Sequence, residues 1–349
     1  MTDFYIYVVI PVYNCEAYLE EAVRSVLKQE YKRIEIVLID DGSKDGSSAL
    51  CDKLAQEYSR ITVIHQENNG VSSARNTGIE FILQKHRDSL EGRYIAFLDA
   101  DDAWVDGFFT NTSVSAFPHT HIVRFQSQRC NSTFTRCCEP IPMEEGMYAG
   151  GKDMISRCLS QHFGAALYAC GLLEAHTIRF SERLRYSEDV LFLRKCVSLA
   201  DSVALLNKIL YMYRNNPVSA VHIRNFGITY FEPMFAAYLA TDSDGEGFVS
   251  WYLVDMIDEH FRHFGTVSEL KQWMAGHEEY VELARKHGGE RANSVLAALD
   301  SHPLSYALKR YVIGGVSKLA RKVIHVRSVS ALVERVKYPI QLKIDNQNP

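Results

Sequence analysis

The chain has 349 residues, of which 47% are hydrophobic, and a formal net charge of −5 at pH 7. This length and apolar content suffice for a core and for more than one domain. The mild acidity argues against a nucleic-acid-binding protein. The N-terminus shows no basic and apolar leader of the secretory type, and no stretch reaches the length of a membrane-spanning helix. We therefore expect a cytoplasmic protein.

The first hundred residues alternate apolar strands with amphipathic helices. Runs such as Val8-Val9-Ile10 and Ile36-Val37-Leu38-Ile39 are typical of parallel strands covered on both faces. The predicted strands are Tyr5–Pro11, Ile34–Asp40, Ile61–His65 and Arg93–Asp99. The predicted helices are Cys15–Gln29 with Asn14 as N-cap, Ser47–Tyr58 and Ser72–Gln84. This order predicts an α/β fold with a doubly wound, mainly parallel sheet and helices on both faces.

The alternation weakens after Asp102, although further elements are still predicted. They are a strand over Ile122–Gln126, a loop or hairpin over 129–150, helices over Gly151–Leu159 and Ser187–Leu199, and short strands over Ser202–Leu206 and Ile209–Tyr213. From Phe248 onward the pattern is helical. The eight cysteines form no C-x-x-C pair, so we expect reduced thiols and neither a zinc site nor a disulfide framework.

Positive charge is concentrated near the C-terminus. Residues 305–343 contain nine basic side chains and a single acidic one, Glu334. An amphipathic helix of this composition can lie on an anionic membrane surface, at the inner face of the cell membrane. It can equally pack on the protein and expose its basic face to solvent. The sequence leaves both interpretations open.

Three polar motifs follow predicted strands directly. They are Pro11-Val12-Tyr13-Asn14, Asp40-Asp41-Gly42-Ser43 and Asp99-Ala100-Asp101-Asp102. The carboxyl ends of strands in an open α/β sheet meet at one crevice, where ligands bind. Clustered aspartates repel one another unless a hard cation such as Mg²⁺ or Mn²⁺ neutralises them, and such a cation keeps positions open for phosphate. The motifs therefore predict one metal-assisted site for a phosphorylated or nucleotide-bearing substrate.

Five segments together resemble the family 2 glycosyltransferases, which have the GT-A fold. They are Val9–Asn14, Ile39–Ser47, Asn69–Gly78, Phe97–Trp104 and Ser187–Phe192. The resemblance covers about residues 5–215. It implies a GT-A domain over 1–220, with a donor half of about 1–110 and an acceptor half of about 111–220. A mainly helical region, 221–349, would follow.

The resemblance also implies roles in holding a nucleotide-sugar donor, most simply a UDP-sugar. Asp41 would accept a hydrogen bond from the uracil, because an ionised carboxylate is an acceptor only, and Asp40 would support it. Pro11 and Tyr13 would line the base, although a plain surface tyrosine explains Tyr13 equally well. Arg75 would contact the donor nucleotide through its planar fork.

Metal binding and base catalysis are implied in the same way. Asp101 would bind Mn²⁺ or Mg²⁺, Asp99 would bind the metal or the ribose, and Asp102 would orient the donor sugar. Asp189 would deprotonate the acceptor hydroxyl, which then attacks the anomeric carbon with inversion, and Glu188 would shape the acceptor site. Acidic residues are also common in a first helical turn, and that reading of Asp189 stays open.

Further along, Arg214 would face the diphosphate. The segment Gly164–Leu172 lacks the tryptophan and basic pair that many relatives carry, so the acceptor contacts are not implied. The expected acceptor is a glycan or a lipid-linked saccharide in surface-polysaccharide synthesis.

Other functions fit the sequence less well. A nicotinamide-dependent oxidoreductase needs G-x-G-x-x-G after the first strand, where Pro11-Val12-Tyr13-Asn14 stands instead. A sugar-nucleotide pyrophosphorylase needs a glycine-rich phosphate loop, which is also missing. A non-catalytic nucleotide-sugar or glycan-binding protein of the same fold remains an alternative.

Overall fold

A computed structural model describes residues 4–110, 120–151, 154–158, 161–184, 187–216, 231–241, 267–287 and 289–301, together with Val249 and Leu253. The chain divides into two compact units, Met1–Val249 and Ser250–Pro349. Each unit is described by itself below.

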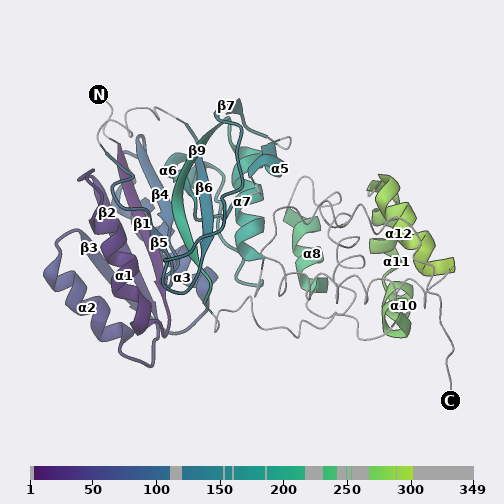
Figure 1. Cartoon of the computed structure of the whole chain (residues 1–349), viewed down its shortest axis with the longest axis horizontal. Coiled ribbons are helices and arrows are strands. Elements are labelled where there is room, and N and C mark those ends of the chain that lie inside the picture. The colour runs from purple at the N-terminus through teal and green to yellow at the C-terminus, as the bar shows by residue number, and fades with distance from the viewer. Residues whose placement is uncertain are drawn as a thin grey trace, which may run out of the picture. The chain divides into compact units, whose positions relative to one another are not determined.

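The first half of the sheet is parallel, as predicted. Its strands are β1 (Tyr5–Val12), β2 (Ile34–Asp41), β3 (Ile61–Gln66) and β4 (Arg93–Phe97). The helices that connect them are α1 (Glu16–Leu27), α2 (Ser47–Glu57) and α3 (Val71–Lys85). β1 lies between β2 and β4, and β3 adds to the other side of β2 (Figure 1).

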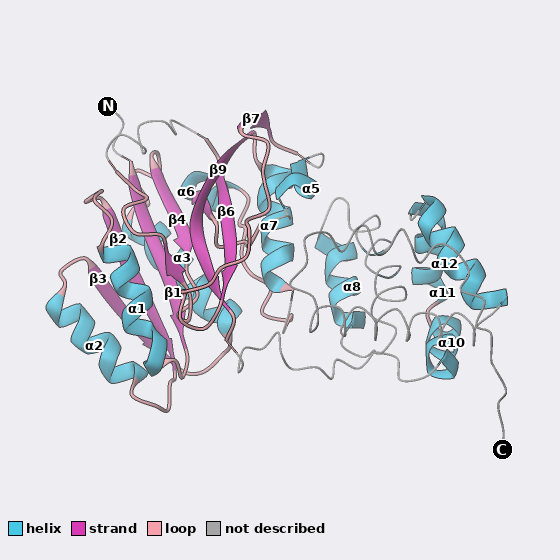
Figure 2. Cartoon of the chain, viewed as in Figure 1, coloured by secondary structure: helices cyan, strands magenta, loops and turns pink. Residues whose placement is uncertain are grey.

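The second half continues the same sheet with mixed strand directions. Its strands are β5 (Ala103–Trp104), β6 (Ile122–Cys130), β7 (Gly146–Ala149), β8 (Ala166–Ala169) and β9 (Ser202–Arg214). The order is β3-β2-β1-β4-β8-β6-β9-β5, and β7 also pairs with β9. β8 runs antiparallel to β4 and β6, whereas β6 and β9 are parallel (Figure 2). The predicted α/β class with a mainly parallel, doubly wound core is therefore confirmed.

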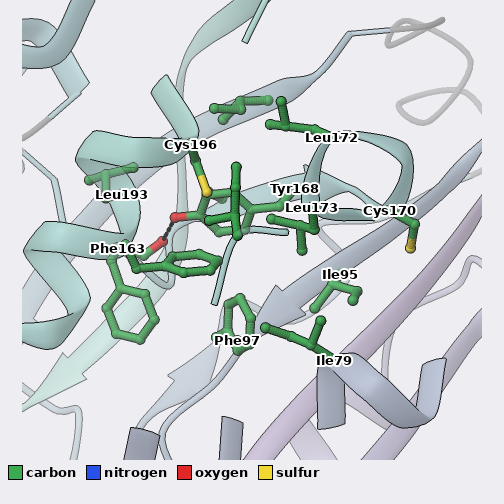
Figure 3. Close-up of a cluster of buried hydrophobic side chains, with 14 of the residues drawn as sticks. Ile79, Ile95, Phe97, Phe163, Tyr168, Cys170, Leu172, Leu173, Leu193 and Cys196 are labelled. Carbon is green, nitrogen blue, oxygen red and sulfur yellow. Dashed lines mark hydrogen bonds between the residues drawn. The ribbon is translucent and has the colours of Figure 1, made fainter. Parts of the chain in front are cut away.

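Apolar side chains fill both faces of the sheet. On one face, α1 contributes the stripe Leu19, Ala22, Val23 and Val26, which the sequence periodicity predicts. The other face is covered by α3 and by α5 (Ile155–Cys158), α6 (Cys170–Ala175) and α7 (Glu188–Leu199). Figure 3 shows Phe97 near the centre of this second cluster, whose ring contacts the rings of Phe163 and Tyr168. Each such ring stabilises the fold by about 1.5–3 kcal/mol.

The helices that follow the sheet belong to different units. α8 (Phe231–Thr241) lies in the first unit, where the Tyr238 hydroxyl donates to the Ser187 carbonyl oxygen (3.2 Å). The second unit contains α10 (Val267–Gly276), α11 (Glu278–His287) and α12 (Gly289–Ser301), as the helical pattern predicts. None of the helices within the described ranges is both long and apolar enough to cross a bilayer. The boundary at 220 and the basic segment 305–343 lie outside the described residues and stay predictions.

Several sequence-based predictions were wrong in detail. The two short strands over 202–213 are one strand, β9, whose pairing with β6 shifts register near Gln126. β8 and α6 were missed, because four small or apolar residues are too few to show a period. Asn14 is not a helix cap. It has φ 50° and precedes the N-cap Cys15.

The cysteine prediction also fails at one place. Cys130 and Cys137 form a disulfide, since they face each other across a short antiparallel bridge. Cys138, the next residue, is exposed and unpaired with another cysteine. The disulfide thus closes a short loop that begins at the end of β6.

Candidate active site

The ends of β1 and β2 bring the first two motifs together. These strands are neighbours, with Val12 opposite Asp40. Beyond them, the Asn14 backbone N–H donates to Ser43 Oγ (3.2 Å), and Asn14 Oδ1 accepts from the Lys44 N–H (2.7 Å). The two turns are therefore tied to each other. Tyr13 lies between them with 46% of its surface exposed, open to a ligand.

Asp40 and Asp41 are both buried but face different partners. Asp40 accepts from the Ser43 N–H (3.0 Å) and is bonded to His65 Nδ1 (2.8 Å). Although burial raises the pKa of Asp40, hydrogen bonds from Ser43 and His65 bring it below its ordinary value. Asp40 is thus an ionised anchor of the turn.

Asp41 organises the loop that leads into α3. Its Oδ1 accepts from Gln66 Nε2 (2.7 Å) and the Asn69 N–H (3.0 Å), and its Oδ2 accepts from the Gly70 N–H (2.9 Å). Three of the roughly four acceptor positions of a carboxylate are therefore used. One position on Oδ2 remains for a ligand donor. Asp41 can therefore stabilise the Asp-Gly turn and still accept the predicted hydrogen bond from a base.

Arg75, on α3, is the central cation of the site. Its Nη2 donates to Asp99 Oδ1 (2.7 Å) and its Nη1 to Glu188 Oε1 (2.9 Å). The guanidinium lies 4.6 Å from the centroid of the Phe163 ring. α3 approaches β1 closely because it carries Gly78, where a Cβ would lie 2.5 Å from Val9 Cγ1. The end of β4 and the start of α7, 89 residues apart in sequence, are therefore joined through one buried side chain.

The three aspartates of the carboxylate motif have separate surroundings. Asp102 is buried, and its oxygens accept from the Tyr211 hydroxyl (2.6 Å) and the Arg214 N–H (2.7 Å). Asp101 Oδ2 accepts from Asn216 Nδ2 (2.9 Å). Asp99 is half-buried against Arg75. Hydrogen bonds from β9 and from Asn216, which follows it, thus hold Asp101 and Asp102 in place.

Arg214 was predicted to face the diphosphate, but it is buried among protein groups. Its Nε donates to the Asp101 carbonyl oxygen (2.5 Å). Its two Nη atoms bond to Glu21 and to the Ser132 carbonyl oxygen, and the guanidinium lies over the Phe134 ring (4.0 Å). The side chain therefore supports the backbone of the motif.

The charges of this cluster are not balanced by the protein alone. Burial and the neighbouring carboxylates raise the pKa of Asp101 and, more strongly, that of Asp102. Burial also raises the pKa of Asp99, but Arg75 lowers it to a net value below the ordinary one. A divalent cation would relieve this repulsion and favour the ionised forms. The residues present therefore fit a metal ion.

His162 joins the cluster, although no pattern in the sequence predicts this. One ligand atom each from Asp99, Asp102 and His162 lies within 4.8 Å of the others. Burial lowers the pKa of His162, so the ring is neutral near pH 7. A lone histidine outside every recognised motif carries no signal of its own, and only the fold places it here.

Glu188 and Asp189 begin α7 after the N-cap residue Ser187, which has φ 59° and makes no side-chain cap hydrogen bond. Glu188 is buried against Arg75, and burial, with the charge of Asp189, raises its pKa to about 7. Asp189 is less buried, and its Oδ1 accepts from the Val190 N–H (2.8 Å). Glu188 thus faces the interior, whereas Asp189 is the more accessible carboxylate of the pair.

Comparison with known proteins agrees with this geometry. Residues 7–112 match the family described as Glycosyl transferase family 2. The chain is 31% identical over 223 residues to the uncharacterized glycosyltransferase EpsJ of Bacillus subtilis strain 168, a match that covers 62% of each chain. It is 41% identical over 107 residues to the minor teichoic acid biosynthesis protein GgaB of the same organism, covering 30% of this chain and 11% of GgaB. The chain thus spans less than two thirds of these curated relatives.

Solved structures share the fold. S. aureus TarS 1–349 in complex with UDP-GlcNAc aligns with a TM-score of 0.63 and 18% identity, covering 91% of this chain and 92% of that one. The chain described here therefore carries a family 2 glycosyltransferase domain with the GT-A fold.

Proposed function

We propose that the protein is an inverting, metal-dependent glycosyltransferase. It transfers a sugar from a UDP-linked donor to a hydroxyl group of a glycan or lipid-linked saccharide, in the synthesis of a cell-surface polysaccharide. The observation that carries this proposal is the chain of contacts Asp99–Arg75–Glu188. It gathers the carboxylate motif, the donor-side helix and the start of α7 into one site.

The donor is held by the motifs at the strand ends. Pro11 and Tyr13 line the base, and Asp41 uses its remaining acceptor position for the uracil N–H, with Asp40 fixing the turn beneath. That UDP-sugars suit this fold is supported by the solved complex of TarS with UDP-GlcNAc. Arg75, already bound to two carboxylates, organises the donor site rather than binding phosphate alone.

A bound Mn²⁺ or Mg²⁺ would neutralise the charge that builds on the departing diphosphate. Asp101 and Asp99 would hold it, because both are less buried than Asp102. Asp102, fixed by Tyr211 and Arg214, orients the donor side of the site.

Asp189 accepts the proton of the acceptor hydroxyl. The hydroxyl oxygen then forms a bond to the anomeric carbon as the bond from that carbon to the diphosphate oxygen breaks on the opposite face, which inverts the configuration. The buried Glu188, held by Arg75, shapes the acceptor side.

The acceptor class rests on the relatives. One relative is named for minor teichoic acid biosynthesis, and others are named as glycosyltransferases. We propose a comparable acceptor, reached at the inner face of the cell membrane. The basic segment 305–343 would then contact anionic lipid.

A panel of nucleotide sugars with and without Mn²⁺ tests this proposal, with thermal shift to report binding and nucleotide release to report turnover. We expect stabilisation and release with one or more UDP-sugars, dependent on Mn²⁺. Binding without turnover in the presence of candidate acceptors would favour the non-catalytic alternative. The absence of both responses for every nucleotide sugar would contradict the proposal.

A further inference from the structure

Arg124 is a fully buried cation whose role the site description leaves unexplained. It lies on β6, between β8 and β9, and its side chain has no exposed surface. No carboxylate among the described residues lies within ion-pair distance of it. Burying an arginine without such a partner is costly unless its donors are satisfied. Backbone carbonyls satisfy its two Nη atoms, whereas its Nε has no hydrogen-bond partner among the described residues.

All four of its Nη hydrogen bonds go to backbone carbonyls. Nη2 donates to Cys158 (2.7 Å) and Gln161 (3.0 Å), and Nη1 donates to His162 and Phe163 (3.1 Å each). Hydrogen bonds from a charged donor are each worth about 1.5–3 kcal/mol. The fork of one guanidinium thus holds the turn Gln161–Phe163 and the end of α5 at Cys158.

This turn holds His162 against the carboxylate motif. The His162 Nε2 atom lies 3.9 Å from Asp99 Oδ2, and its ring packs on Tyr211 with centroids 4.5 Å apart. Arg75 binds the other oxygen of Asp99, Oδ1. The two oxygens of Asp99 are therefore flanked by two different groups, and together these fix its rotation.

The orientation of the ring also assigns its proton. The Gly164 N–H donates to His162 Nδ1 (3.3 Å), so Nδ1 carries the lone pair. In the neutral imidazole the proton then lies on Nε2, which faces Asp99. His162 thus directs its Nε2–H toward Asp99 Oδ2 from 3.9 Å, an electrostatic contact that is too long for a hydrogen bond, and it is not a ligand of the metal in this arrangement.

Phe163 in the same turn has an anchor that does not depend on Arg124. The Tyr168 hydroxyl donates to the Phe163 carbonyl oxygen (2.7 Å), as Figure 3 shows. Its ring is also packed in the aromatic cluster around Phe97. His162 has one other backbone anchor of this kind, because its N–H donates to Ser127 Oγ (3.0 Å). Loss of Arg124 should therefore disturb His162 more than Phe163.

We propose that Arg124 is a positioning residue for the transfer reaction, which acts on Asp99 through the turn 161–163 and the ring of His162. This inference rests on the proposed function, because it makes Asp99 part of the donor and metal site. Arg124 touches neither donor nor acceptor. Its contribution is to hold the carboxylate in the rotation that the metal and diphosphate require.

A double-mutant cycle tests the pathway. Arg124→Lys keeps the charge but cannot reach four carbonyls, and His162→Ala removes the proposed relay. Arg157→Lys is the control, since it makes the same chemical change at an exposed arginine paired with Glu144. For each variant we would measure kcat and KM with the active UDP-sugar, the dissociation constant of Mn²⁺ without substrate, and hydrogen exchange of the amides around 161–164.

We expect Arg124→Lys to lower kcat/KM by about 10–100-fold and to weaken Mn²⁺ binding, with faster amide exchange around 161–164. In the His162→Ala background the same change should cost less than about 2-fold, because the relay is already gone. An equal cost in both backgrounds, or unchanged Mn²⁺ binding by a folded Arg124→Lys, would overturn the inference. If no UDP-sugar is turned over by the wild type, the proposed function fails, whereas metal binding and amide exchange still test the role of Arg124.

Discussion

Replacing Arg75 with methionine should be among the most damaging single changes in the first unit. Arg75 is buried and joins Asp99 and Glu188 at 2.7 and 2.9 Å. Methionine fills a similar volume but leaves both carboxylates without their cation. Removing one partner of a buried ion pair typically costs about 3–5 kcal/mol, because the remaining charge is uncompensated. We expect a loss of that size in the free energy of unfolding at pH 8.

The loss should depend on pH in a definite direction. In the wild type, the pKa of Glu188 is already raised to about 7, and Arg75 opposes that rise. Without Arg75 the pKa of Glu188 rises further, and that of Asp99 rises from its lowered value. As pH falls, both groups take up protons and the repulsion disappears. The stability difference between wild type and Arg75→Met should therefore shrink from pH 8 to pH 5.

Urea denaturation of both proteins at the two pH values measures this difference. Arg24→Met is the matched control, since Arg24 is exposed and pairs only with Glu20 and Tyr58 on the surface. It should cost nothing measurable, as exposed pairs contribute little. If Arg75→Met behaves like Arg24→Met, or if its loss grows on acidification, the assignment of Arg75 as the central cation is wrong.

Three other predictions concern features away from this cation. Cys130→Ser with Cys137→Ser opens the loop closed by their disulfide and should lower stability by roughly 2–3 kcal/mol in thermal or urea unfolding, whereas Cys138→Ser should not. His65 contacts Asp40 and Asp52, and the hydrogen bond that His65 donates to Asp40 raises the pKa of His65. Its stabilising effect is therefore full below its ordinary pKa and is lost as pH rises through the raised value; a His65→Gln variant less stable than wild type at pH 9 but not at pH 5 would contradict this. Deletion of 305–349 should abolish co-sedimentation with anionic liposomes, and retained binding would mean that this segment is not a membrane element.

Local patterns were enough to predict the parallel part of the sheet. Continuous apolar runs indicate buried strands, and the helix stripe of α1 follows from spacing alone. The strand ends then place Asp40, Asp41 and Asp99 at one edge, because parallel strands share a direction. These features depend on residues close together in the chain.

The rest of the site depends on contacts that no local pattern encodes. Tyr211 and Asn216 hold Asp102 and Asp101 from more than a hundred residues away. His162 lies beside the motif just before β8, which inserts between β4 and β6, and Arg124 contacts the backbone around His162. Four-residue β8 is too short to show a period, so the approach of His162 to Asp99 could not be predicted. Arg214 was predicted to face the donor, and its burial depends on the loop after Cys130.

Transfer by the wild type compared with Asp189→Asn tests the central claim most directly. With the UDP-sugar found in the donor panel, Mn²⁺ and a saccharide acceptor, the wild type should release UDP in step with glycosylated product. Asp189→Asn should bind the donor with unchanged affinity and form no product, because the amide cannot take the hydroxyl proton. Product formation by Asp189→Asn at near the wild-type rate would contradict the account.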